Sequence, residues 1–359
     1  MTWRDARDFV LSPGASIREA MALIDRNRGG IALVADEAGR LLGTITDGDI
    51  RRAMLQDLPA TASVAALIER RPPAARRDPV AAPLGTPAEE LLRLMGARGV
   101  RQIPLVEPDG RIAAVALMQD LVKESDLPVR AVIMAGGRGQ RLMPLTEELP
   151  KPMLPLGGRP LLERTIRHLK DAGVRRVAIT THFRPEKIAG HIGDGSAFGV
   201  AVDYLVEDTP LGTAGALRRL DAAAEPILVI NGDVLTNVDF GAMLAYHREH
   251  EAAATVAVRK YELVVPYGVV ESEAGLVSRV VEKPHHAFFI NAGIYLLEPE
   301  TVREIPADGR FDMTDLIARL VAARRPVASF PIHEYWIDIG EHENYSQAER
   351  DLSAGRLGR

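Results

Sequence analysis

The chain has 359 residues, of which 47% are apolar and 26% charged, so it is long enough for two globular domains and ordinary in composition. Its net charge of −5 argues against a general nucleic-acid-binding surface. The sequence contains no cysteine, which excludes disulfides and thiolate chemistry.

The N-terminus shows no targeting segment. Charged residues follow Met1 almost at once, where a signal peptide would have a long apolar core. No apolar stretch in the sequence approaches the roughly 20 residues of a membrane span. We therefore expect a soluble, cytoplasmic protein with no membrane partner.

The first 125 residues contain a degenerate internal repeat. Residues 39–50 align with residues 110–121, an offset of 71 positions. Each copy is predicted to run helix, strand, turn, strand, helix. The helices are expected at 17–26 and 88–97 and the strands before each turn at 30–34 and 102–106. Residues 69–83, rich in proline, alanine and arginine, are expected to form a loop between the copies.

This half resembles a pair of CBS domains, because residues 43–49 (Gly-Thr-Ile-Thr-Asp-Gly-Asp) match their strand-to-helix motif. The resemblance covers about residues 1–125 and implies a regulatory or association role. It implies that Thr46 and Asp49 contact the phosphate and ribose of an adenine nucleotide. The second copy keeps Asp120 but has Leu117 in place of the threonine. The alternative is that Thr46 and Asp49 only cap the following helix. CBS pairs usually associate, so a homo-oligomer is expected.

After a predicted linker at 123–128, strands alternate with helices, which indicates an open, mostly parallel α/β sheet. Such sheets bind ligands at the carboxyl ends of their strands. The strands are expected at 131–135, 176–180, 201–205 and 226–230, and the helices at 161–172, 185–192 and 214–224.

A glycine-rich loop follows the first of these strands. Glycines let backbone N–H groups approach phosphate oxygens, and cations close behind can neutralise phosphate charge. The loop is neither a P-loop, since no Gly-Lys-Ser/Thr follows, nor a good Rossmann motif, since prolines keep the chain extended. The residues concerned are Ala135, Gly136, Gly137 and Gly139, with Arg141 and Lys151 as the cations.

The loop at 135–142 together with Pro-Lys-Pro-Met-Leu-Pro at 150–155 resembles the sugar-1-phosphate nucleotidyltransferases over residues 129–350. The resemblance implies a Rossmann-like domain in which the loop, Arg141 and Lys151 bind the triphosphate. Asp233, at the end of a strand, suits Mg²⁺, which prefers a few hard oxygen ligands. The family's W-x-D-x-G element, here at 336–340, implies that Asp338 completes the metal site.

Further motifs imply the contacts to the sugar 1-phosphate. Val-Glu-Lys-Pro at 281–284 resembles the family's E-K-P element, in which Glu282 would bond sugar hydroxyls and Lys283 would hold the sugar phosphate. The turn at Tyr267 and Gly268, and Asn291 further on, match other sugar-contacting elements.

The segment 211–217, with Gly212 and Thr213, borders the nucleobase in that family, and Glu207 lies just before it. Guanine presents two adjacent N–H donors that one carboxylate can accept together. This favours GTP as the substrate, whereas uracil or thymine would suit an amide better. A surface glutamate that never meets the base is the alternative for Glu207.

The implied reaction joins a sugar 1-phosphate to a nucleoside triphosphate and releases pyrophosphate. The attacking phosphate oxygen is already an anion, so catalysis is positioning and charge neutralisation. A GDP-glucosamine- or GDP-mannose-type product is expected. Uridylyl or thymidylyl transfer and a non-catalytic, nucleotide-sensing subunit remain alternatives. A dehydrogenase is disfavoured, because no acidic residue follows the glycines at the expected spacing.

Overall fold

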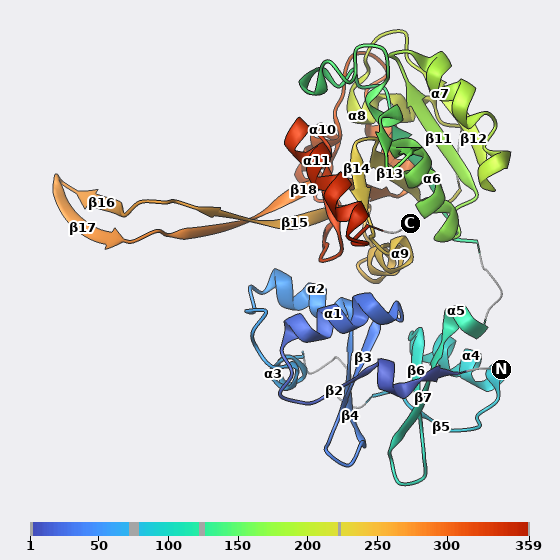
Figure 1. Cartoon of the computed structure of the whole chain (residues 1–359), viewed down its shortest axis with the longest axis vertical. Helices are drawn as coiled ribbons and strands as arrows, with labels where there is room; N and C mark the ends of the chain where they lie inside the picture. Colours follow the sequence, from blue (N-terminus) through green and yellow to red (C-terminus); the bar gives the residue numbers. More distant parts are fainter. Residues whose placement is uncertain (1–2, 72–78, 122–125, 222–223, 358–359) are drawn as a thin grey trace. The chain divides into compact units, whose positions relative to one another are not determined.

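The computed structural model describes residues 3–71, 79–121, 126–221 and 224–357 (Figure 1). The chain divides into two compact units, Met1–Asp126 and Leu127–Arg359. Half of the predicted linker, residues 123–125, lies outside the described residues. No helix in the described ranges is long and apolar enough to cross a bilayer.

The first unit contains two α+β copies joined in one chain. In chain order its helices and strands are β1 (Arg4–Asp5), β2 (Val10–Leu11), α1 (Ile17–Asn27), β3 (Ile31–Ala35), β4 (Leu41–Thr46), α2 (Asp47–Leu55), α3 (Val64–Glu69), β5 (Ala82–Pro83), α4 (Ala88–Arg98), β6 (Gln102–Val106), β7 (Ile112–Leu117) and α5 (Met118–Leu121). The predicted helices and long strands are present with ends shifted by one or two residues. The region 69–83 is not wholly a loop, because β5 pairs in parallel with β6.

The two copies have matching sheets, in the orders β2-β3-β4 and β5-β6-β7, with β1 added beside β7. The predicted turns meet, since the amide of Leu41 donates to the carbonyl of Gly110 and that of Ile112 to Gly39. A shared apolar cluster lies between the copies: Phe9, Ile31, Leu33, Val115 and Leu117. The repeat seen in the sequence is therefore a structural repeat.

The second unit is larger and contains the long sheet. Its strands and α-helices are β8 (Arg130–Met134), β9 (Pro155–Leu156), β10 (Arg159–Pro160), α6 (Leu161–Asp171), β11 (Arg176–Thr181), α7 (Pro185–Ile192), β12 (Ala201–Val206), α8 (Gly212–Gly215), β13 (Ile227–Asn231), β14 (Val234–Thr236), α9 (Phe240–Glu249), β15 (Ala254–Val264), β16 (Val269–Glu273), β17 (Leu276–Val281), β18 (His285–Leu297), α10 (Met313–Ala322), β19 (Val327–Pro331), β20 (Trp336–Asp338) and α11 (His342–Ser353).

The seven-stranded sheet has the order β12-β11-β8-β13-β18-β15-β19. Strands β12, β11, β8 and β13 are parallel, and β18 runs antiparallel to both of its neighbours. The predicted α/β class with a mostly parallel sheet is confirmed. Because β8, β11 and β13 point the same way, their carboxyl ends meet at one edge.

Helices cover both faces of this sheet, because successive residues of a buried strand point to opposite sides. In β8, Ala131 and Ile133 face a core that includes apolar residues of α6, α7 and α9. Val132 faces the other core, with residues of α8 and α10. The sheet is the middle layer of three, which holds its carboxyl edge rigidly.

The predicted helix at 214–224 is wrong in length. Only α8 and a short 3₁₀ turn, Ala216–Arg219, form there. The amides of Ala214 and Gly215 both donate to the carbonyl of Phe311, at 3.1 and 2.9 Å. These tertiary bonds fix the start of the segment against another loop instead of a long helix. Residues 222–223 of the prediction lie outside the described chain.

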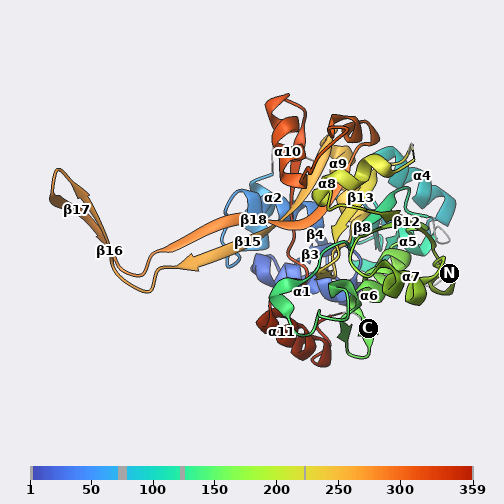
Figure 2. The same cartoon turned by 90° about the horizontal axis from the view of Figure 1, so that it is seen from above.

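A two-stranded arm projects from the second unit (Figures 1 and 2). β15 and β18 pair from Ala254 with Leu297 out to Val264 with His285. β19 accompanies β15 only as far as Val258. Residues 259–290, which we call the arm, therefore pair only within themselves among the strands of the described chain, and β16 and β17 form the tip.

Candidate active site

A pocket of about 260 Å³ lies at the carboxyl ends of β8, β11 and β13. The topology places it there, because three parallel strands end together and the loops that follow them diverge. Its lining residues are Met134, Gly136, Gly137, Lys151, Pro152, Thr180, His182, Glu207, Pro210, Gly212, Thr213, Asn231, Gly232, Asp233, Arg310 and Asp312. Much of the predicted nucleotide-binding and catalytic set is thus brought together.

The glycine loop curls tightly over the end of β8. The amide of Ala135 donates to the carbonyl of Thr180, and the hydroxyl of Thr146 donates to the carbonyl of Gly139 at 2.8 Å. Gly139 has φ +64°, and a Cβ there would lie 2.9 Å from the Cβ of Lys151. Both the positive φ and the closeness of Lys151 require glycine at position 139. The missing side chain lets Lys151 pack beneath the loop.

Gly232 fits directly under the glycine loop. Its amide donates to the carbonyl of Met134 at 2.9 Å, and an added Cβ would lie 2.6 Å from that same carbonyl oxygen. No real Cβ occupies such a position, and the obstacle is backbone that cannot rotate away. The residue therefore sets the distance between the end of β13 and the end of β8.

Replacing Gly232 with alanine is expected to push these strand ends apart and to lower the free energy of unfolding by about 2 kcal/mol. Activity should fall with it, because Asp233 is the next residue. Gly190 in α7 is the matched control, since a Cβ there would meet nothing within 4 Å. Gly190→Ala should stabilise slightly. Equal thermal melting of the two variants would contradict this account of Gly232.

Asp233 and Asp338 are far apart in the sequence but adjacent in space. β14 and β20 form an antiparallel pair with Val234 opposite Asp338, and the amide of Ile339 donates to the carbonyl of Asp233 at 2.9 Å. This small ladder carries the C-terminal W-x-D-x-G segment to the pocket edge. Two carboxylates therefore lie side by side at the carboxyl end of the sheet.

The environment of Asp338 fits a bound cation. Its Oδ1 is buried without a hydrogen-bond partner among the described residues, as is Oδ1 of Asn231 in the pocket wall. Burial, followed by the negative charge of Asp233, raises the pKa of Asp338. A divalent metal would coordinate these oxygens and would offset both the burial of Asp338 and the repulsion from Asp233.

Lys151 and Arg141 bring positive charge to the same place. Lys151 is buried, and its Nζ lies 2.5 Å from Oδ2 of Asp233. Arg141 lies over Gly340, where an added Cβ would be 3.3 Å from the guanidinium and 3.4 Å from Oδ1 of Asp338. Arg141 is mostly exposed and has only a long contact, 3.5 Å, with Glu341. It is free to turn toward an anion in the pocket.

Glu207 is buried where β12 ends. Its Oε2 accepts a hydrogen bond from the amide of Leu211 at 2.8 Å. Its Oε1 lies toward the glycine loop, since a Cβ on Gly136 would be 3.3 Å from it. The carboxylate therefore holds its own loop with one oxygen and presents the other inside the pocket.

Gly212 and Thr213 are held against the loop before α10. Gly212 has φ +83°, and an added Cβ would lie 2.5 Å from the carbonyl of Phe311. The amide of Thr213 donates to Asp312 at 2.9 Å, and its hydroxyl accepts from the amide of Met313. These residues shape the pocket wall, and their polar groups are mostly used within the protein.

The predicted sugar-binding residues are split between the pocket and the arm. Asn291 is near the pocket, because its Oδ1 accepts from the amide of Gly293 and an added Cβ on Gly293 would lie 2.7 Å from the side chain of Asn231. Six residues separate Asn291 from His285, so at about 3.3 Å per residue the arm beyond His285 begins roughly 20 Å away. Tyr267, Gly268, Glu282 and Lys283 lie on that distal part.

Sequence reasoning missed His182, Arg310 and Asp312, which also line the pocket. His182 follows β11, so the carboxyl-end rule could have identified it. Its Nδ1 lies 2.8 Å from the carbonyl of Glu207. Arg310 and Asp312 come from a loop before α10 and pair with each other at 3.1 Å. No sequence motif marks them.

In the first unit, Thr46 and Asp49 form a reciprocal capping box at the start of α2. Asp49 also pairs with Arg71 at 2.8 Å and with Arg52 at 2.9 Å. Thr46 and Asp49 therefore do cap α2, and their predicted contact with a nucleotide stays a prediction. Any nucleotide contact by these side chains would have to share them with the cap.

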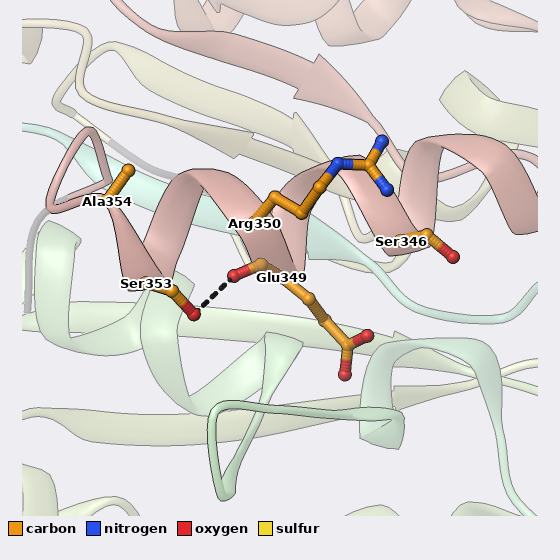
Figure 3. Close-up of a pocket in the computed structure, with 5 residues that line it drawn as sticks. All are labelled: Ser346, Glu349, Arg350, Ser353 and Ala354. Carbon is orange, nitrogen blue, oxygen red and sulfur yellow. Dashed lines mark hydrogen bonds between the residues drawn. The ribbon is translucent and has the colours of Figure 1, made fainter.

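A second hollow lies along α11 (Figure 3). The hydroxyl of Ser353 donates to the carbonyl of Glu349 there, at 2.9 Å. One helix and the residue after it supply the whole lining: Ser346, Glu349, Arg350, Ser353 and Ala354. Because these residues all come from one helix and its end, their polar groups do not converge on a common ligand position.

Comparison with family models agrees with these two units. The family model of nucleotidyl transferases matches residues 130–355, and that of the CBS domain matches residues 5–56 and 74–126. The solved structure of HddC from Yersinia pseudotuberculosis has 27% sequence identity and a TM-score of 0.50, over 62% of this chain and 99% of that one. A second structure of HddC is complexed with GMP-PN.

Curated relatives are similar in the second unit. The "Probable mannose-1-phosphate guanylyltransferase 1" of Oryza sativa subsp. japonica is 34% identical over 228 residues, covering 60% of this chain and 63% of that protein. The mannose-1-phosphate guanylyltransferase of Mycobacterium tuberculosis is 32% identical over 234 residues, 63% of this chain and 65% of that protein. The chain thus spans just under two thirds of the length of these relatives.

Proposed function

Since the chain belongs to the nucleotidyl transferase family, we propose that it is a sugar-1-phosphate guanylyltransferase. The observation that carries this proposal is the approach of Asp233, Asp338 and Lys151 beside the glycine loop. Paired carboxylates, a buried lysine and free backbone amides are what transfer of a nucleotidyl group to a phosphate requires. The mannose-1-phosphate guanylyltransferase relatives make mannose 1-phosphate the first sugar phosphate to test.

In the proposed reaction, an oxygen of the sugar phosphate attacks the α-phosphorus and pyrophosphate leaves from the opposite side. The amides of the glycine loop hold the triphosphate, and Arg141 neutralises charge on the departing pyrophosphate. Lys151, fixed by Asp233, holds the α-phosphate region. The nucleophile is an anion from the start, so the protein needs no general base.

Members of this family generally use a divalent metal, and we propose Mg²⁺ here, held by Asp233 and Asp338. The unpartnered Oδ1 of Asp338 supports these ligands. When bound, the ion would supply charge neutralisation for the phosphates. The carboxylates' part is to fix its position, and Lys151 limits the repulsion between them by pairing with Asp233.

Glu207 is proposed to select guanine. Its free oxygen faces the pocket, and its other oxygen keeps a lone pair beside the bond from Leu211. The guanylyltransferase relatives support the same base. Uridylyl or thymidylyl transfer is the second candidate, and a non-catalytic sensing subunit is the third. A cytoplasmic location stays a prediction.

Replacing Glu207 with glutamine is expected to lower kcat/KM for GTP about tenfold to a hundredfold, because one guanine donor loses its acceptor. The glutamine oxygen can still accept from Leu211, so the loop should keep its shape. Asp208, whose side chain is 91% exposed, provides the control Asp208→Asn. Steady-state kinetics with GTP and UTP measure the effect. An unchanged preference between the two triphosphates would remove Glu207 from base selection.

Pyrophosphate release tests the proposed function itself. The full chain with Mg²⁺ is assayed with GTP, UTP, dTTP and CTP, each against the 1-phosphates of mannose, glucosamine, N-acetylglucosamine and glucose. Release with GTP and one sugar phosphate is expected. Release with UTP or dTTP only would keep the class and reject the guanine assignment. No release with any pair, although GTP binds, would favour the sensing subunit.

The first unit is proposed to bind an adenine nucleotide and to have a regulatory role or a role in association between copies of the chain. Asp49 accepts a hydrogen bond from Thr46 and pairs with both Arg52 and Arg71. Two cations therefore lie next to the predicted phosphate contact. Calorimetric titration of the full chain with AMP, ADP and ATP tests this, with Thr46→Ala as the variant. Heat that is the same in both chains, or absent, would count against the site.

A further inference from the structure

We propose that two copies of this chain exchange their arms, so that the arm of one copy completes the acceptor side of the other copy's pocket. This inference rests on the proposed function, because it assigns the arm to the sugar-phosphate side of that site. It identifies both an interaction surface and the partner, a second copy of the chain.

The arm is far more apolar on its surface than a solvated hairpin should be. Of the 17 exposed large hydrophobic side chains in the described chain, nine lie within residues 259–290. They are Tyr261, Leu263, Val264, Tyr267, Val270, Leu276, Val277, Val280 and Phe288. Such a concentration marks a surface that another surface covers.

Neither face of the arm is covered by its own unit. Successive residues of a strand point to opposite faces, so Leu276 and Val277 lie on different sides. They are 76% and 64% exposed. An isolated two-stranded ribbon is marginally stable in water, and its outer edges leave backbone groups unpaired. The ribbon therefore needs a second surface on both sides.

The arm, as the structure has it, extends away from its own pocket. The pairing of β15 with β18 continues from the core sheet out to Val264 and His285, with one bulge near Val256 and Val258. Both views show the ribbon leading away from β8 and β13, whose ends carry the pocket (Figures 1 and 2). In this extended form the arm can be received by a second copy without any change in its course.

The pocket lacks positive charge that the arm carries. Among its lining residues, Lys151 and Arg310 face three carboxylates, Glu207, Asp233 and Asp312. Both cations are already paired, with Asp233 and Asp312. Arg141, at the pocket edge, is assigned to the triphosphate, so the sugar phosphate still lacks a cation of its own among the described pocket residues.

The arm supplies a suitable group partway along its length, where β17 leads into β18. Lys283 is exposed and has φ +46°, which fixes the bend between β17 and β18. Glu282 packs over Gly268, since a Cβ there would lie 2.9 Å from its Oε2. A cation, a carboxylate and the 74% exposed ring of Tyr267 are thus presented together. This is a set suited to a sugar phosphate, with the charge on the phosphate and the ring beside the sugar.

The area involved is large enough for a stable pair. The nine side chains expose on the order of 1,000 Å² of mostly apolar surface, above the few hundred Å² usual for a monomer's largest patch. Two exchanged arms would together bury roughly 2,000 Å² or more, within the range of permanent dimers. A closed two-fold pair satisfies both copies with the same contact.

Complementation between two inactive variants tests the exchange. One variant, Lys151→Met, damages the pocket and leaves the arm intact. The other, Glu282→Ala with Lys283→Ala, damages the arm and leaves the pocket intact. The two full chains carry different tags, are unfolded and refolded together, and mixed dimers are purified by both tags in succession. Pyrophosphate release is then measured.

Arm exchange predicts that the purified mixed dimers recover about half of wild-type activity per chain, because one of the two sites in each dimer is intact. A mixture of Lys151→Met with Asp233→Asn is the matched control, since both lesions lie in the pocket and no intact site can form. No recovery from mixed dimers, a monomeric wild-type enzyme, or an arm variant with full activity would each overturn the proposal.

Hydrogen exchange of the arm amides gives a readout that does not need activity. In the exchanged dimer, amides 269–281 should be protected, and dilution that yields monomers should expose them. Protection of these amides that does not change with protein concentration would mean that the arm folds onto its own unit. Amides that are unprotected at every concentration would also overturn the exchange. If the wild-type chain releases no pyrophosphate but shows concentration-dependent protection, the proposed function fails and the exchange stands.

Discussion

Asp233→Asn is expected to lower turnover at least about a hundredfold, with nearly native folding. The substitution removes the negative charge next to Asp338, weakens the proposed metal site and leaves Lys151 without its anionic partner. The amide is isosteric with the carboxylate, so packing under the glycine loop should persist. Turnover is measured by pyrophosphate release, and metal affinity by titration with Mn²⁺ followed by electron paramagnetic resonance.

The control for this variant is Asp171→Asn, at a surface position where the side chain is 71% exposed. It changes the net charge equally and should leave both activity and Mn²⁺ binding unchanged. Near-normal turnover of Asp233→Asn would refute the metal assignment. Lost turnover with unchanged Mn²⁺ affinity would move the role of Asp233 to positioning Lys151.

Lys151→Met is expected to cost a factor of about a hundred or more in kcat/KM, because it removes the buried cation that is proposed to hold the α-phosphate region. Methionine fills a similar volume, so Gly139 should keep its contact. The variant also leaves Asp233 without its cation. Lys187→Met, on the exposed side of α7, is the control with the same chemical change.

Lys151 and Asp233 touch at 2.5 Å, so their effects should not be independent. In a double-mutant cycle, the Lys151→Met, Asp233→Asn variant should lose less activity than the product of the two single losses. Simple multiplication of the two effects would show that the ion pair has no part in the reaction. The cycle is measured on kcat/KM at saturating metal.

Strand and helix positions around the pocket could be predicted because their local signals agree with the tertiary structure. The run at 131–134 is apolar and is followed, after Ala135, by glycines; it belongs to the buried parallel strand β8, and the loop comes next. The predicted helix at 214–224 was wrong for the opposite reason. Its helix-forming residues were overruled by hydrogen bonds to Phe311, nearly a hundred positions away, which no local pattern records.

Within the site, the residues that carry motifs were located, and those that only line the wall were not. Asp233 and Asp338 come from motifs with fixed neighbours, and β14 and β20 place them together. Arg310 belongs to an irregular loop that approaches the pocket only through tertiary contacts. The sugar-side residues show a third case. The motif marks Lys283 as a candidate. The position of Lys283 relative to a pocket depends on the direction of the arm, which no local sequence pattern determines.

The pairing of β14 with β20 also has a consequence for how the protein is made. Asp233 leaves the ribosome about a hundred residues before Asp338, and the β14–β20 ladder brings the two together. A nascent chain that has reached β14 can already form the glycine loop and most of the parallel strands. It has a single carboxylate at the strand ends until the segment at 336–338 is synthesised. If the proposed metal assignment holds, competence for the reaction arrives late in translation, and fragments released early have the nucleotide loop without the second acid.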